Sequence, residues 1–179
     1  MKKILSVALV FCLLLGICSL FSGCSNTGRV TYLNPVPEAD AAWTELAQTF
    51  QKETGISVSI ISVEPERYEE VLLDYMASFS PVSLYHVDTD KALDDYLDYL
   101  FNLSGTGVES ALADDSFSFR DSRDKLLAVG FREGSRWAVN GKVSRVDVEA
   151  TVAFLTWVVT SPEGKAMLKE QFGDLAIAD

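Results

Sequence analysis

The chain has 179 residues, a formal net charge of −11, three cysteines and one histidine. This length suits one compact domain, and the acidity excludes nucleic acid as a partner, because a protein that binds phosphates needs a basic surface. One histidine and few cysteines exclude the usual zinc sites, and the sequence contains no glycine-rich phosphate loop, so we expect neither a metal nor a cofactor.

The N-terminus combines a short positive region with an apolar stretch. Lys2 and Lys3 precede residues 4–21, which are uncharged and mostly apolar. This pattern is typical of a signal peptide, although its length also fits an uncleaved membrane anchor. The following segment, Phe21-Ser22-Gly23-Cys24, resembles the lipobox of bacterial lipoproteins, with an aliphatic residue more usual where Phe21 stands. The lipobox favours the cleaved signal peptide over the anchor.

The lipobox resemblance has several implications for the mature protein. It implies removal of residues 1–23, a diacylglyceryl group on the thiol of Cys24, and a lipidated tether over residues 24–28. Two acyl chains give stable anchoring where one would be marginal. The resemblance therefore implies a protein held by its lipid anchor on the extracytoplasmic face of the cell membrane. No other cysteine remains after cleavage, so the mature chain has no internal disulfide.

The first half of the mature chain predicts strands that alternate with helices. We expect strands over residues 29–33, 56–63 and 82–87, and helices over residues 38–54, 65–80 and 88–101. The helices are predicted from apolar stripes at helical spacing, which are Trp43, Leu46, Ala47 and Phe50; Tyr68, Val71, Leu72, Tyr75, Met76 and Phe79; and Leu93, Tyr96, Leu97, Leu100 and Phe101. A βαβαβα order predicts a layered α/β sheet with parallel strands.

The second half predicts a hairpin followed by two helices. A short helix is expected over residues 108–113, and strands are expected over residues 125–131 and 136–139 with a tight turn between them. Ser144 begins a capping box for a long helix that reaches about Val159. Ser161 and Pro162 begin another helix, which Gly173 ends. The fold class is thus α/β.

Two separated parts of the sequence resemble extracellular solute-binding proteins of ABC importers, in the maltose-binding-like, carbohydrate-binding group. The resemblance lies in Val-Thr-Tyr-Leu-Asn-Pro from residue 30, Ala-Asp-Ala-Ala-Trp from residue 39, Glu-Thr-Gly-Ile-Ser-Val from residue 53, Trp-Ala-Val-Asn from residue 137, and Phe-Leu-Thr-Trp-Val-Val-Thr-Ser-Pro-Glu-Gly-Lys from residue 154. It implies a lobe like those of type II periplasmic binding proteins, in which a mainly parallel sheet is flanked by helices.

The resemblance also implies that one lobe is missing. Members of the family are more than twice as long and hold the solute between two lobes. Here residues 125–131 match the strand before the first crossing, and residues 136–140 match the strand after the return. The second lobe is therefore absent near residues 132–136. We expect a single lobe over residues 29–173 and a C-terminal tail over residues 174–179.

Polar side chains follow the predicted parallel strands, at the edge where α/β sheets bind ligands. By the family resemblance, the ligand-binding candidates are Asn34, Glu38, His86 and Asp88, with Glu64 and Tyr68 in matching positions after the second strand. Carboxylates and amides pair with sugar hydroxyls. Each candidate also has a structural interpretation. Glu38 and Asp88 suit helix starts, Tyr68 suits a core stripe, and His86 suits a buried strand.

The resemblance implies carbohydrate binding for an ABC importer, with the ABC permease and the membrane as partners. The alternative is a lobe-only interaction module, or a remnant of a solute-binding protein without a transport role. An enzyme is not expected, because His86 is the only histidine base for nucleophilic catalysis. Acidic residues abound, but nothing in the sequence places an isolated carboxylate pair in a cleft, as a glycosidase needs.

Overall fold

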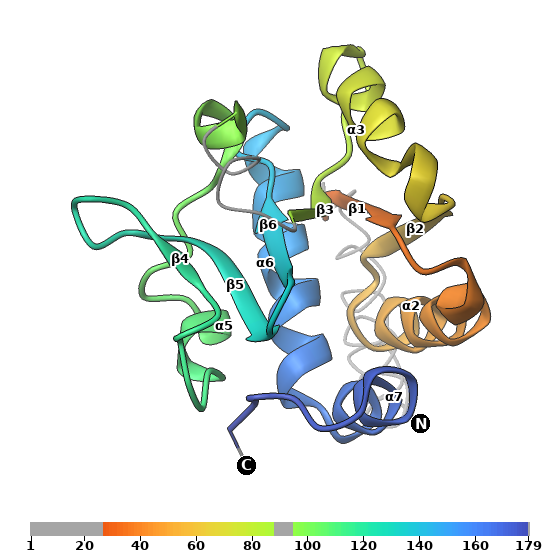
Figure 1. The fold of residues 1–179 in the computed structure, drawn as a ribbon. Helices are drawn as coiled ribbons and strands as arrows, with labels where there is room; N and C mark the ends of the chain where they lie inside the picture. The colour runs from red at the N-terminus through yellow and green to blue at the C-terminus, as the bar shows by residue number, and fades with distance from the viewer. Residues whose placement is uncertain (1–26, 88–94, 179) are drawn as a thin grey trace, which may run out of the picture.

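The computed structural model describes residues 27–87 and 95–178, which form one six-stranded sheet with helices on both faces (Figure 1). The strands are β1 (Arg29–Asn34), β2 (Ser57–Ser62), β3 (Leu84–Val87), β4 (Phe119–Arg120), β5 (Leu126–Arg132) and β6 (Ser135–Val139). The α-helices are α2 (Asp40–Thr54), α3 (Tyr68–Ala77), α5 (Gly107–Ser110), α6 (Arg145–Thr160) and α7 (Pro162–Phe172). Single 3-10 turns are η1 (Pro37–Ala39), η2 (Pro65–Arg67) and η3 (Leu97–Tyr99).

The sheet has the order β2-β1-β3-β6-β5-β4. β1 pairs in parallel with β2 and β3, whereas β6 is antiparallel to both β3 and β5. β5 therefore runs in the same direction as β1, β2 and β3, and four of the six strands share one direction. The expected α/β lobe with a mainly parallel sheet is confirmed. The carboxyl ends of those four strands, together with the β5–β6 turn, lie at one edge.

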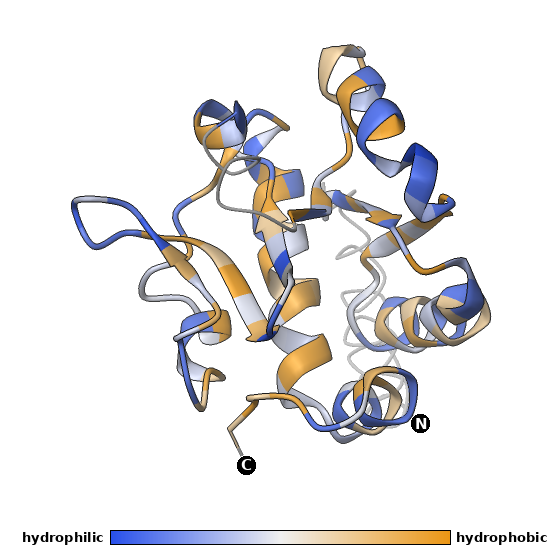
Figure 2. Ribbon diagram, viewed as in Figure 1, coloured by the Kyte–Doolittle hydropathy of each residue, from blue (hydrophilic) through white to orange (hydrophobic). Residues whose placement is uncertain are grey.

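Strand alternation divides the core between the two faces of the sheet. Helices α2, α5, α6 and α7 cover one face, where they pack on Val30, Tyr32, Leu84, Val129 and Trp137. Helix α3 covers the other face and packs on Leu33, Tyr85 and Val87. Figure 2 shows hydrophobic residues concentrated on α6 and β5 near the centre. The larger core is therefore on the α6 side, and the carboxyl edge of that side holds the cavity described below.

Two predicted helices end earlier than expected. Helix α3 stops at Ala77, because Ser78 takes an extended backbone and its hydroxyl donates to the Tyr75 carbonyl. The expected inward position of Phe79 was wrong, since Phe79 lies beyond the helix and is fully exposed. Of the helix expected over residues 88–101, residues 88–94, including Leu93, lie outside the described part. The predicted C-terminal end of this helix at residue 101 was also wrong, because Leu100 is not helical and forms a β-bridge with Asn140.

The starts of the last two helices follow the predicted capping signals. The Ser144 hydroxyl accepts from the Asp147 amide at 3.2 Å, and the Ser161 hydroxyl accepts from the Gly164 amide at 3.0 Å. These bonds satisfy amides that have no partner within the helix. Among the described residues, no helix is long and apolar enough to span a membrane.

The residues that follow α7 pack back on the lobe. Ile177 forms a bridge with Leu112, and the Ala176 amide donates to the Phe131 carbonyl at 2.8 Å. The Lys165 ammonium group, on α7, donates to the Ala178 carbonyl. The segment over residues 174–178 is thus joined by hydrogen bonds to β5 and to the loop after α5, and it brings Leu175 to the carboxyl edge.

Two phenylalanines provide a test of whether this lobe folds as one unit. Phe154 of α6 is fully buried against Phe50 of α2, with ring centroids 5.1 Å apart, whereas Phe79 is fully exposed. We expect Phe154→Ala to lower the free energy of unfolding by about 3–5 kcal/mol, and Phe79→Ala to change it by less than about 0.5 kcal/mol. Urea unfolding of the chain from Ser25 onward measures both. Separate transitions for the two faces would contradict the single cooperative lobe.

Candidate functional site

A cavity of about 220 Å³ opens at the carboxyl edge of the sheet. Its lining is mostly apolar and comes from strands, loops and the C-terminal segment: Tyr32, Pro35, Val36, Pro65, His86, Phe131, Arg132, Gly134, Trp137, Phe172 and Leu175. Small-molecule pockets usually have volumes of about 300–1,000 Å³. The cavity therefore has the mostly apolar lining of a ligand site but is smaller than most such pockets.

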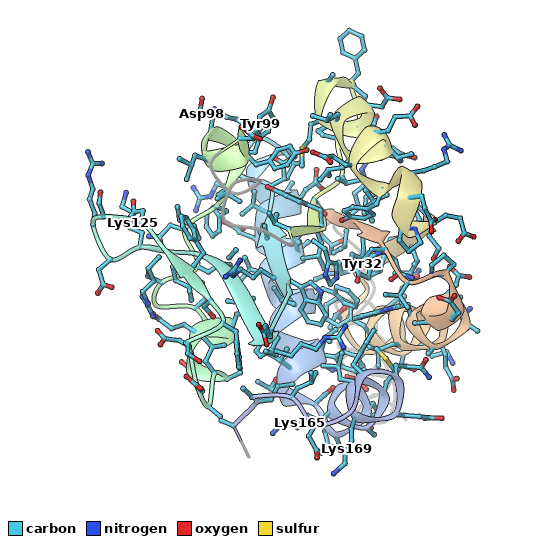
Figure 3. All side chains as sticks on the ribbon, viewed as in Figure 1. Tyr32, Asp98, Tyr99, Lys125, Lys165 and Lys169 are labelled. Carbon is cyan, nitrogen blue, oxygen red and sulfur yellow. The ribbon has the colours of Figure 1, made fainter. Side chains whose placement is uncertain are left out.

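Three neighbouring strands supply the floor of the cavity. Tyr32 of β1, His86 of β3 and Trp137 of β6 project to the same face, because each occupies the matching phase of strand alternation. His86 and Trp137 are directly opposite each other in the β3–β6 ladder, and their ring centroids lie 5.4 Å apart at 89°. Figure 3 shows Tyr32 near the middle of the molecule, above α7 in this view.

His86 and Tyr32 form a buried hydrogen-bonded pair. The Tyr32 hydroxyl lies 2.7 Å from His86 Nε2, and the two residues are only 1% and 7% exposed, respectively. Desolvation by burial, with a smaller contribution from the nearby Arg132 charge, lowers the pKa of His86 to about 3. Burial raises the pKa of Tyr32 well above its usual value, and the neighbouring Tyr68 adds to this. At neutral pH both groups are therefore uncharged.

Further aromatic rings extend this floor into a cluster. Phe131 of β5 packs edge-on against Trp137 with ring centroids 5.6 Å apart, and Trp43 of α2 packs against Trp137 at 5.8 Å. Phe172, the last residue of α7, lies at the cavity wall, with the Arg132 guanidinium carbon 5.3 Å from its ring centroid. The cavity thus presents apolar ring surfaces beside one positive charge, an arrangement that suits a flat apolar ligand face with a polar substituent.

The structure places Asn34 in the fold beside the cavity and not in its lining. Asn34 is fully buried, and its amide nitrogen donates to the Val36 carbonyl at 2.8 Å and the Ser62 hydroxyl at 3.0 Å. Its side-chain oxygen accepts from the Val36 amide at 3.1 Å. These bonds hold the turn that carries Pro35 and Val36 to the cavity. A direct ligand contact by Asn34 stays a prediction.

The other sequence candidates fall in different places. Glu38 is exposed within η1 and does not line the cavity, and Glu64 is exposed at the start of η2. Tyr68 is buried, and its hydroxyl accepts from the His86 amide at 2.7 Å, so it links α3 to β3. His86 lines the cavity. Asp88 and the lipidation candidate Cys24 lie outside the described residues, so their roles stay predictions.

Most of the cavity lining was not among the sequence candidates. Arg132 and Trp137 flank the predicted hairpin turn, which lies at the carboxyl edge because β5 runs in the same direction as β1, β2 and β3. The predicted turn was the sequence signal that could have pointed to these two residues. Phe172 and Leu175 carry no comparable signal, since only the packing of α7 and the following segment brings them to this edge.

Over residues 27–87 and 95–178, no group of three or more histidine, cysteine, aspartate or glutamate side chains is arranged to hold a metal ion. The described cavity lining consists of aromatic rings, the buried imidazole of His86, the guanidinium of Arg132 and non-aromatic apolar residues.

The chain matches no protein-family model and no curated protein sequence. Among solved structures, it is similar to a family 1 extracellular solute-binding protein from Bifidobacterium longum subsp. infantis, with 16% identity, a TM-score of 0.49, and 59% of this chain matched to 28% of that one. RafE from Streptococcus pneumoniae, also solved with raffinose, gives 18% identity, a TM-score of 0.48, and coverages of 62% and 29%.

A sugar transporter from Bacillus licheniformis, solved with stachyose, gives 23% identity, a TM-score of 0.49, and coverages of 57% and 27%. This chain thus spans less than a third of the length of each of these three solved proteins.

The lowered pKa of His86 makes stability depend on pH. The unfolded chain binds this proton near pH 6.5 and the folded chain only near pH 3, so stability falls as the pH drops through this window. We expect His86 to make the protein about 2 kcal/mol less stable at pH 5 than at pH 7. Urea unfolding of the wild type and of His86→Gln measures the difference, which the variant should lose.

The ring signals of the single histidine give a direct control by NMR. They should keep their neutral-imidazole shifts down to pH 5, because the ring remains desolvated. A titration centred near pH 6.5 in the folded protein would contradict the buried, neutral imidazole.

Proposed function

We propose that the chain is a membrane-anchored, extracytoplasmic solute-binding lobe that binds a carbohydrate for an ABC importer. The observation that carries the proposal is the aromatic-lined cavity at the carboxyl edge of the sheet, formed by Tyr32, Trp137 and Phe172. Aromatic rings bind the apolar faces of pyranose sugars, and this edge is where open α/β sheets bind ligands. The sequence resemblance to carbohydrate-binding proteins points to the same class of solute.

The missing lobe sets the expected affinity. Arg132 and Ser135 pair directly across the β5–β6 turn, so nothing at this junction provides an opposing wall. Water then reaches the bound solute, and each hydrogen bond contributes only about 1 kcal/mol net. A micromolar complex corresponds to about 8 kcal/mol of binding free energy, and if one lobe keeps half of that, the affinity falls to the millimolar range.

The same hairpin favours a second candidate function. Closure of two lobes on a solute is not available to a chain in which β5 turns directly into β6. A lobe-only interaction module, or a remnant without a transport role, needs no such closure. Solute binding separates this alternative from the lead proposal, because only an importer component needs the cavity to bind a sugar.

NMR titration with common mono- and oligosaccharides tests the binding role. We expect millimolar dissociation constants, with shifts at Tyr32, His86 and Trp137, because these residues form the cavity floor. Phe172→Ala should weaken binding about threefold to tenfold by removing one wall. Phe79→Ala is the matched control, since Phe79 is exposed and does not line this cavity.

Two outcomes would change the interpretation. No shifts with any saccharide would remove the carbohydrate role and favour the interaction module or remnant. Micromolar binding would contradict the single-lobe reasoning and would require a second copy of the chain to rebuild the missing wall.

Lipidation at Cys24 is tested by expression in a bacterial host with labelled fatty acid. The lipobox-like sequence before Cys24 predicts that label enters the wild-type protein and that the mature chain begins at this residue. Cys24→Ala should lose the label. Label that persists in Cys24→Ala, or a different mature N-terminus, would refute the anchor.

A further inference from the structure

The charge of the cavity differs from the charge of the protein. The chain carries 26 acidic and 15 basic residues other than histidine, yet among the described residues no aspartate or glutamate lines the cavity and one arginine does. The remaining lining residues are uncharged, including His86 with its pKa of about 3. A carboxyl group entering the cavity therefore meets a positive charge and, from the described lining residues, no negative charge. A positive charge in an otherwise uncharged described lining attracts an anionic group and repels a cationic one.

The position of Arg132 suits it for contact with a ligand. It is the last residue of β5, it is exposed, and its guanidinium carbon lies 5.3 Å from the Phe172 ring centroid. Among the described residues, no carboxylate forms an ion pair with Arg132. The aromatic ring supports the guanidinium plane without neutralising its charge, so its hydrogen-bond donors stay available.

The other cations of this region have structural partners. The Lys169 ammonium group pairs with Asp174 at 3.4 Å, and the Lys165 ammonium group donates to the Ala178 carbonyl. Figure 3 shows both lysines on the side of α7 away from Tyr32. Arg136 follows Arg132 across the hairpin, but its Nε donates to the Phe117 carbonyl at 2.7 Å. Arg132 is therefore the cation that the cavity presents to a solute.

We propose that the cavity selects a solute with a carboxylate group, a sugar acid of the uronate type, whose carboxylate binds the Arg132 guanidinium while its ring lies on the aromatic floor. This inference rests on the proposed carbohydrate-binding function and names the class of sugar. A guanidinium can bind a carboxylate through two parallel N–H···O bonds, and such charge-assisted bonds are stronger than bonds to neutral hydroxyls. A neutral sugar gains no comparable contact with Arg132.

NMR titration with three probes tests this inference. The probes are D-glucose, D-glucuronate, and cyclohexanecarboxylate, which has a carboxylate on an apolar ring but no sugar hydroxyls. We expect D-glucuronate to bind about tenfold more tightly than D-glucose, because one charge-assisted contact is added. Added salt should weaken glucuronate binding and leave glucose binding unchanged.

Variants of Arg132 separate charge from geometry. Arg132→Gln should remove the preference for D-glucuronate, and Arg132→Lys should keep part of it, because lysine preserves the charge but not the bidentate fork. Arg123→Gln makes the same change of charge at an exposed turn outside the cavity lining and should leave the preference intact. Thermal unfolding of each variant shows whether the lobe remains folded.

The three probes distinguish failure of this inference from failure of the proposed function. Equal binding of D-glucose and D-glucuronate, or a preference that persists in Arg132→Gln, would overturn the carboxylate inference and leave carbohydrate binding intact. Binding of cyclohexanecarboxylate alone would retain the role of Arg132 for carboxylates but overturn the sugar. No binding of any probe would overturn both.

Discussion

The fold and the cavity both depend on the position of β6 between β3 and β5. This strand is antiparallel to both neighbours, and its ladder places Trp137 opposite His86 of β3 and Val129 of β5. Because β6 follows β5 through a short turn, the second half of the chain joins the sheet of the first half without an intervening domain. The same pairing brings Tyr32, His86 and Trp137 to one face at the carboxyl edge. Without it, the lobe would have neither a continuous sheet nor a cavity floor.

The cavity floor combines polar groups with a strongly apolar environment. His86 and Tyr32 are buried among aromatic rings, and their mutual hydrogen bond offsets part of the cost of removing both from water. The same desolvation holds the imidazole neutral. The positive charge in the described cavity lining therefore comes from Arg132, and not from His86. Among the described lining residues, this division leaves an uncharged floor and one charged group at the rim.

The C-terminal part of the chain completes the site. Phe172 at the end of α7 and Leu175 just after it form one wall, and the following residues are held by hydrogen bonds to Phe131 and Ala111. Phe172 and Leu175 border a cavity of about 220 Å³.

Periodicity and turn chemistry in the sequence determined most elements of the fold. The alternation of strands and helices over residues 29–87, the tight turn after β5, and the serine caps of α6 and α7 are local signals, and the structure follows them. His86 could be assigned to the ligand edge because it ends a parallel strand. The tertiary structure alone decided that Phe79 is exposed, that the Asn34 amide serves a turn, and that Phe172 and Leu175 wall the cavity. Those outcomes depend on where a helix stops and which distant segments pack together, and neither is encoded in the spacing of neighbouring residues.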